Sequence, residues 1–333
     1  MRSLNQSPDR QSSSQRRSKT GQAICAACAV FLVAALWCGQ RVPLVWGQAD
    51  GIPKSLSAEN PKTAAGGKPD AAAADQAQAL VKQAHAQLLT RRTIQADVVE
   101  VATLTEPPLR MTGRYVASGL KLRLEYQVQL SGGVSGSLVE VCDGERLWSL
   151  MQLPGSQRVT RRDVRQILVA AEKARMRPDR AAAVDLALGG LPALITSLQR
   201  SMNFESVKED TLEDQPVLVL TGRWTKELAQ QLGGDAKSPQ FPPHIPDACR
   251  LTLAAETLFP VRLSYFKRQE KGMRMLLDLR FQNVMLDGIV ADSEFRFTPP
   301  DDTEPEDVTR EYIEQLFPES AESGDAAGTT PQK

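Results

Sequence analysis

The amino-acid sequence predicts a mainly β domain with a few helices, in which neighbouring strands run antiparallel and short turns connect them. Three observations support this fold class. Apolar and polar residues alternate over residues 120–130, an Asp143-Gly144 turn separates the two Val/Leu-rich halves of Val139–Trp148, and two prolines follow the aromatic segment 294–298. Alternation indicates a strand with one dry face, and Asp-Gly indicates a hairpin. Proline ends a strand because it cannot donate a hydrogen bond to a sheet.

The first 49 residues are predicted to form a signal peptide. Arg16, Arg17 and Lys19 precede an uncharged apolar run, Ala23–Cys38, and small residues follow at Gly47–Ala49. This order is typical of secretory leaders, and the run is shorter than the roughly 20 residues of a membrane-spanning helix. We therefore expect export to the periplasm or cell envelope. The alternative is an uncleaved leader that anchors the chain in the inner membrane.

After the leader, charge and composition indicate a linker and an acidic tail on either side of the predicted domain. Cleavage would leave 34 basic and 39 acidic side chains, since the leader takes six of the 40 basic residues and one of the 40 acidic ones. A chain without a basic excess lacks the cationic footprint of nucleic-acid binding. Residues 50–75, which mix Pro, Gly, Ala, Lys and Ser, are predicted to be a disordered linker. Residues 310–333 are predicted to be a disordered acidic tail, with a docking segment as the alternative.

Residues 76–309 remain as a single predicted domain. It begins with a helix over 76–92, where Leu80, Val81, Ala84 and Leu88 form an apolar stripe. Helices are also predicted over 164–175 and 191–202, and a short amphipathic helix over 307–317. Besides the Asp-Gly hairpin, strands are predicted over 94–98, 109–117, 120–130, 204–212, 217–223, 250–255, 261–267, 273–284 and 294–298.

Short motifs occur in the order of a known family. A strand with Gln95-Ala96-Asp97 follows the first helix, and then come a strand with Gly113, the segment Val141–Trp148, a helical insert and the segment Phe295–Asp302. Over residues 77–309 the chain resembles the LolA/LolB-type lipoprotein localisation family, also described as outer-membrane lipoprotein-sorting proteins. The resemblance implies a curved antiparallel sheet that forms an unclosed half-barrel, with helices over its concave face. It also implies a cavity for acyl chains of lipoproteins or lipids.

Two features depart from the pattern of that family. Ala117-Ser118-Gly119 stands where carriers often show a basic residue followed by proline, and the loop Gly233–Asp247 is an extra one. Both departures bear on whether the cargo is a lipoprotein, and neither changes the predicted fold.

The candidate ligand-binding residues come from the apolar faces of the predicted strands and of the helix over 191–202. This helix follows Gly189-Gly190, so we expect a flexible lid over the concave face. Methionine side chains suit a cavity for variable chains, although the same residues would form an ordinary core if the lid packs tightly. The candidate lining residues are Leu122, Leu124, Tyr126, Leu194, Ile195, Leu198, Met202, Met275 and Leu277.

Motifs for catalysis or metal binding are sparse. His85 and His244 form no ligand pair with spaced cysteines or carboxylates, and the run Gly133–Ser137 lacks the last glycine of a nucleophile elbow. No catalytic residue, metal or cofactor is therefore predicted. Cys142 and Cys249 are the cysteines outside the leader. In an oxidising compartment a disulfide between them is a candidate, and two buried free thiols are the alternative.

The sequence thus favours an envelope carrier whose partners are acyl chains of lipoproteins or lipids, with envelope membrane proteins as further candidate partners. A non-enzymatic sensor or interaction domain is the alternative, because proteins that resemble this fold also serve in envelope-stress signalling. A hydrolase is a third hypothesis, and it would depend on His244 or Ser135.

Overall fold

The computed structural model describes residues 71–104, 108–129, 133–173, 184–185, 188–232, 241–270 and 272–316. The predicted signal peptide, most of the predicted linker and the end of the predicted acidic tail lie outside these residues. Within the described part of the chain, no helix is long and apolar enough to cross a membrane.

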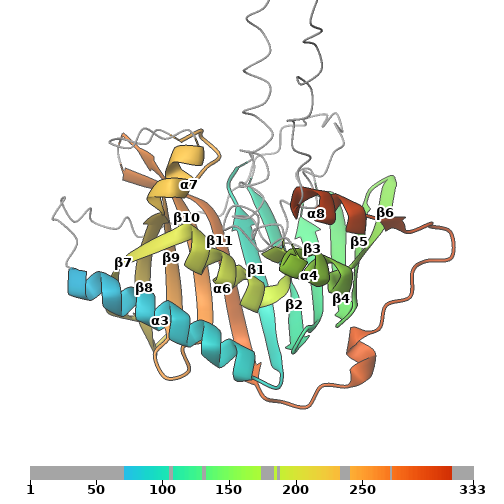
Figure 1. The fold of residues 1–333 in the computed structure, drawn as a ribbon, viewed down its shortest axis with the longest axis horizontal. Helices are drawn as coiled ribbons and strands as arrows, with labels where there is room; N and C mark the ends of the chain where they lie inside the picture. Colours follow the sequence, from blue (N-terminus) through green and yellow to red (C-terminus); the bar gives the residue numbers. More distant parts are fainter. Residues whose placement is uncertain are drawn as a thin grey trace, which may run out of the picture.

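One sheet dominates the described structure, with the strand order β12-β6-β5-β4-β3-β2-β1-β11-β10-β9-β8-β7. Neighbours run antiparallel except for the short parallel pair of β12 and β6. Because β7 and β12 end the order and do not pair with each other, the sheet stays open. Figure 1 shows this sheet curving around the helices that lie inside it. The predicted α+β fold class, with an unclosed antiparallel sheet, is confirmed.

The strands are β1 (Ile94–Ala102), β2 (Leu109–Ser118), β3 (Lys121–Gln129), β4 (Ser135–Asp143), β5 (Arg146–Leu153), β6 (Ser156–Asp163), β7 (Met202–Leu212), β8 (Gln215–Trp224), β9 (Ala248–Ala254), β10 (Pro260–Gln269), β11 (Gly272–Leu286) and β12 (Glu306–Asp307). The helices are α3 (Ala71–Thr90), α4 (Val164–Lys173), α6 (Gly190–Ser201), α7 (Lys226–Gln231), α8 (Thr309–Leu316) and the 3-10 helix η2 (Asp292–Phe295).

The alternation in β3 decides which face of the sheet is dry. Leu122, Leu124, Tyr126 and Val128 are buried, whereas their neighbours in the strand are exposed or half-buried. The predicted hairpin between β4 and β5 is also present. Its turn is stabilised by the Asp143 carboxylate, which accepts hydrogen bonds from the amides of Glu145 and Arg146 at 2.8 Å. Local sequence signals therefore predict β3 and the β4–β5 hairpin correctly.

Helices α3 and α6 cover the dry face of the sheet. The buried residues of α3 are Ala77, Val81, Ala84 and Leu88, and those of α6 include Leu191, Leu194, Ile195 and Leu198. All of them belong to one continuous hydrophobic core with the inner side chains of the strands. In Figure 1, α3 crosses the open side of the curved sheet and α6 lies within the curve.

Helices α4 and α8 pack together beside the other edge of the sheet. They share a small hydrophobic cluster of Ile167, Ala171, Val184 and Leu316. The predicted boundary between the domain and the acidic tail, after residue 309, falls inside α8, so the packed structure continues to Leu316.

The predicted strand over residues 294–298 is wrong. Residues 292–295 form the 3-10 helix η2, and the chain then passes across the outer face of the sheet. There the Phe297 ring stacks on Trp148, with ring centroids 5.7 Å apart. The aromatic residues therefore pack on a face of the sheet and do not extend its edge. The last strand is instead β12, which comes after Pro299 and Pro300.

Strands β6 and β12 and helix α7 were not predicted. Strand β6 reads Ser-Gln-Arg-Val-Thr-Arg-Arg-Asp and buries one aliphatic side chain, Val159, so it shows no apolar alternation. Pairing with β5 and β12 holds it in the sheet. The predicted helix over 191–202 also ends one residue early, because Met202 is the first residue of β7.

Candidate functional site

The concave face of the sheet brings together most of the predicted ligand-binding residues. Met275 is the exception: it is half-buried next to an irregularity in the pairing of β10 and β11, and it lies outside the main core. The residues that share the main core are Leu122, Leu124 and Tyr126 of β3, Leu194, Ile195 and Leu198 of α6, Met202 of β7 and Leu277 of β11. In this structure these side chains pack against one another as a core.

Helix α6 meets the sheet mainly through apolar side chains. At its first turn the Leu191 amide donates a hydrogen bond to the Tyr115 hydroxyl of β2 at 3.1 Å. Gly190 has a positive φ of 74°, and a Cβ atom there would lie 3.2 Å from that hydroxyl. The start of α6 therefore lies very close to the sheet.

Two polar side chains of α6 are directed toward α3. The Thr196 hydroxyl lies 3.0 Å from Nε2 of His85, and the Gln199 side-chain amide donates to the Val81 carbonyl at 3.2 Å. Burial, and secondarily the charge of Arg200, lowers the pKa of His85. Hydrogen bonds thus link the two helices to each other, while apolar contacts dominate between α6 and the sheet.

One carboxyl group is buried in the dry face. Glu100 of β1 is 1% exposed, and its Oε2 accepts a hydrogen bond from the Tyr126 hydroxyl at 3.1 Å. Its other oxygen, Oε1, has no partner among the described residues. Burial raises the pKa of Glu100 to about 7, and the Tyr126 hydrogen bond partly opposes this rise. Glu100 was not predicted from the sequence, although it is in phase with Ile94, Ala96 and Val98 in β1.

A second polar group lies on β4, β5 and β6. Glu140 pairs with Ser149 in the β4–β5 ladder, and Arg162 lies close enough for its charge to lower the Glu140 pKa. Burial has the larger effect and raises that pKa overall. Arg162 is 7% exposed, and its guanidinium lies over the Tyr312 ring at 5.2 Å from the centroid. A buried cation is therefore held in place at this edge of the sheet.

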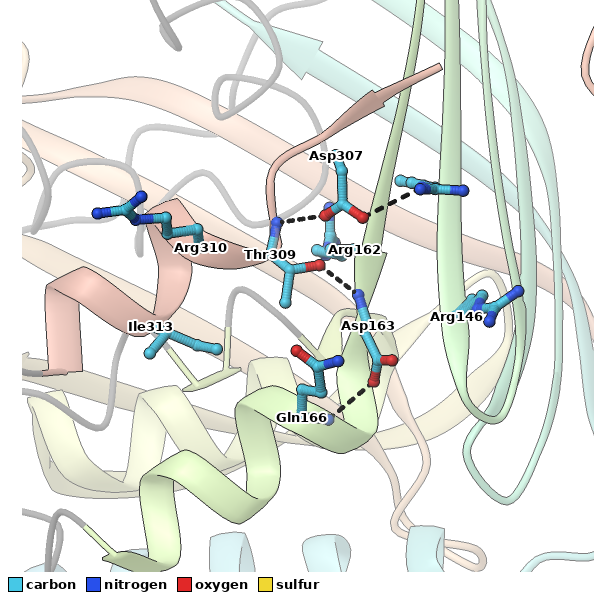
Figure 2. A pocket seen from close by; sticks show the side chains of 9 residues that line it. Arg146, Arg162, Asp163, Gln166, Asp307, Thr309, Arg310 and Ile313 are labelled. Carbon is cyan, nitrogen blue, oxygen red and sulfur yellow. Dashed lines mark hydrogen bonds and ion pairs between the residues drawn. The ribbon is translucent and has the colours of Figure 1, made fainter. Parts of the chain in front are cut away.

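Arg162 also lines an open cavity of about 600 Å³ beside β6, between the end of β12 and the first turns of α4 and α8. We call it the arginine cavity; Figure 2 shows it from close by. It is lined by Arg146, Arg161, Arg162, Asp163, Gln166, Asp307, Thr309, Arg310 and Ile313. Four arginines and two aspartates give this lining a formal charge of +2.

A second cavity, of about 470 Å³, lies where the β7–β8 and β9–β10 turns approach the end of β11. Apolar side chains including Val217, Val261 and Phe281 line part of it. The Phe281 ring packs edge-on against the rings of Tyr115 and Phe259, each at 5.9 Å between centroids. The inner wall of this cavity therefore touches the residue that holds the start of α6.

Cys142 and Cys249 are both free and buried, which agrees with the alternative of two free thiols. Cys142 is on β4 and Cys249 on β9, and five strands separate them in the sheet, so the two sulfur atoms cannot approach bonding distance. Among the described residues, no group of three or more His, Cys, Asp or Glu side chains is arranged to hold a metal ion.

Comparisons with known proteins place the chain near several lipoprotein structures. No family model matches it, and neither does any curated protein sequence. The chain is similar to the lipoprotein LppX of Mycobacterium tuberculosis, with 10% identity, a TM-score of 0.38 and coverage of 65% of this chain and 98% of that one.

Two further structures are also similar to the chain at low sequence identity. LprF of Mycobacterium bovis has 14% identity and a TM-score of 0.38, covering 68% of this chain and 97% of that one. A domain from Vibrio parahaemolyticus, described as an outer membrane lipoprotein-sorting protein, has 10% identity and a TM-score of 0.31, with coverage of 67% and 97%. Similarity at this level assigns no function to the chain.

Proposed function

We propose that this protein is an exported carrier in the cell envelope that binds an acyl chain of a lipid or lipoprotein between α6 and the concave face of the sheet. The observation that carries the proposal is the contact between α6 and the sheet. It consists mainly of aliphatic and aromatic side chains, among them Leu191, Leu194 and Leu122. An acyl chain can replace these apolar contacts, while the Leu191–Tyr115 hydrogen bond at the first turn of α6 stays in place.

The energies of this replacement are of comparable size. Burying one methylene group contributes about 0.8 kcal/mol, so a chain of about 15 methylene groups contributes roughly 12 kcal/mol when fully buried. Removing four apolar side chains of α6 from the sheet costs about 1.5–3 kcal/mol each if water replaces the contact. The cost is smaller when the acyl chain itself fills the space. The free energy gained by burying a long acyl chain is therefore large enough to offset the loss of the contacts between α6 and the sheet.

The cavity at the end of β11 offers an entrance for the chain. Its apolar wall includes Phe281, and the Phe281 ring contacts Tyr115 beneath the start of α6. A chain that displaces the Phe281 ring would reach the dry face without crossing a polar layer. The position of the carrier in the envelope rests on the predicted signal peptide over residues 1–49.

Binding of a fluorescent fatty-acyl probe to lipid-free protein tests the proposal. Leu194→Glu and Leu198→Glu place a charge on the buried side of α6, so each should weaken probe binding by at least about tenfold. Val169→Glu is the matched control, because Val169 is 44% exposed on α4 and lies outside the main core. All variants must retain the far-UV circular dichroism spectrum of the wild type.

Two results would contradict the proposal. One is a lipid-free wild type that binds no acyl probe, which would favour the alternative of a sensor or interaction domain. The other is equal probe binding by the folded Leu194→Glu variant and the Val169→Glu control, which would place the ligand away from α6.

A further inference from the structure

We propose that the arginine cavity beside β6 binds a phosphate group. Guanidinium groups bind phosphate through two parallel hydrogen bonds and are preferred where planar recognition of an oxyanion is needed. Four arginine residues, Arg146, Arg161, Arg162 and Arg310, contribute to the lining of one open cavity of about 600 Å³. This volume exceeds that of a single phosphate and leaves room for a substituent.

The two aspartates of the cavity are already engaged. The Asp307 carboxylate accepts hydrogen bonds from Arg161 Nε at 3.1 Å and from the Thr309 amide at 3.0 Å. Hydrogen bonds from the Thr309 side chain and amide are the main reason why the pKa of Asp307 is lowered. The Asp163 carboxylate accepts a hydrogen bond from the backbone amide of Gln166 at 2.8 Å, in the first turn of α4. These carboxylates position the cavity wall, and the pairing reduces their repulsion of an anion.

Two arginines are available at the rim of the cavity. The Arg146 guanidinium is exposed and makes no ion pair or hydrogen bond with any residue that the structure describes. Arg310 pairs with Glu314 one helical turn away, at 2.6 Å, but both side chains are exposed. Exposed pairs of this kind contribute little to stability, so an anion can compete for Arg310. Figure 2 shows Arg146 and Arg310 on opposite sides of the Asp307–Thr309–Asp163 group.

Arg162 supplies the fixed part of the site. Its side chain is buried, and the Tyr312 ring lies under its guanidinium. Glu140 lies close enough to Arg162 for the two charges to balance each other in part, although burial raises the pKa of Glu140 overall. A guanidinium that is already held in one orientation loses little conformational entropy when it binds an anion.

The arginine cavity is also close to the start of α6. A Cβ atom on Gly189 would lie 3.9 Å from an Arg162 Nη atom and 3.5 Å from the Leu122 side chain. A phospholipid could therefore place its phosphate among the arginines and its acyl chain under α6. Free inorganic phosphate would use the same arginines, so only the lipid source rests on the proposed function.

Isothermal titration calorimetry with two probes tests the site and separates these sources. The probes are inorganic phosphate and a short-chain phosphatidylglycerol, with the diacylglycerol of the same chain length as the uncharged comparison. Arg146→Gln and Arg162→Gln should each weaken phosphate-dependent binding by about tenfold or more, since hydrogen bonds to charged groups are lost. Arg165→Gln is the matched control, because Arg165 is an exposed arginine on α4 that does not line the cavity.

Binding of inorganic phosphate that weakens in Arg146→Gln supports a site for free phosphate. Weakening confined to phosphatidylglycerol, with diacylglycerol unaffected, supports a headgroup site. The proposal is overturned if the wild type binds neither probe, or if Arg146→Gln and Arg165→Gln bind both probes equally well. Because Arg146 is exposed, its variant remains informative even if Arg162→Gln does not fold. If the protein binds phosphate but no acyl probe, only the proposed function is refuted. If it binds an acyl probe equally well in the wild type and in every arginine variant, only this phosphate site is refuted.

Discussion

At the scale of single residues, Glu100 is the side chain that conflicts most with its surroundings. It occupies a buried position on the dry face of β1, where the other inward-facing side chains are apolar. Its carboxylate accepts a hydrogen bond from Tyr126, a residue predicted to line a cavity. The alternation in β1 predicts that position 100 is buried, but no local signal shows which hydroxyl approaches it. That contact depends on the register of β1, β2 and β3, and only the folded sheet defines it.

Replacing Glu100 should alter how stability depends on pH. The pKa of the carboxyl rises from 4.5 to about 7 on folding. Between these values the unfolded chain has lost a proton that the folded chain still binds, so the free energy of unfolding falls as pH rises. This loss amounts to about 3 kcal/mol.

Urea unfolding of the wild type and of Glu100→Gln at pH 4.5 and pH 8 measures this loss. The decrease between the two pH values should be about 3 kcal/mol larger in the wild type. Asp185, whose pKa burial raises to about 6, titrates in both proteins and cancels in the comparison. Parallel pH profiles for the two proteins would show that Glu100 is not buried as described.

The free thiols give a second residue-scale prediction. Burial raises the pKa of Cys249 to about 12 and also raises the pKa of Cys142. Since the thiolate is the reactive form, neither cysteine should be alkylated in the native protein at neutral pH. Both should be alkylated after unfolding without reductant, as peptide mass spectrometry would show. A peptide pair linked through Cys142 and Cys249 would contradict the structure.

At the scale of elements, the sequence predicts those strands whose apolar residues alternate and misses those that tertiary contacts stabilise. β3 and the β4–β5 hairpin follow from alternation and from the Asp143-Gly144 turn. β6 was missed because its composition is polar, and β12 because it is two residues long. The arginine cavity lies between these elements, α4 and α8, so it could not be predicted without them. Most of the predicted lining residues lie in the main core because burial follows the periodicities of strand and helix, and their role in lining a cavity stays a prediction.

The close approach of α6 to the sheet can be tested at Gly190. Gly190 and Gly119 have positive φ angles of 74° and 59°, so alanine at either position costs about 1–2 kcal/mol in backbone strain. A Cβ atom at Gly119 meets open space, whereas at Gly190 it would lie 3.2 Å from the Tyr115 hydroxyl. Gly190→Ala should therefore lower the free energy of unfolding by more than Gly119→Ala, by about another 1 kcal/mol or more. Equal losses in urea unfolding would mean that α6 does not pack against β2 and β3 as described.

At the scale of the whole molecule, an open curved sheet presents one dry face that helices must cover. α3 and α6 cover this face together and are linked to each other by hydrogen bonds, while α4 and α8 form a separate small cluster at the other edge. The proposed function requires α6 to move from the sheet while the strands stay folded. The arginine cavity and the start of α6 are adjacent, so one amphiphilic ligand could occupy both.

Native mass spectrometry of protein purified from its own cell envelope, without detergent exchange, tests the central claim most directly. The proposed carrier should show a second species that is heavier by the mass of one acyl lipid, and collisional activation should release that lipid. Leu194→Glu, purified in the same way, should show mainly the unbound mass. A wild type that appears only at its unbound mass, and that binds no acyl probe afterwards, would contradict acyl-chain binding under α6.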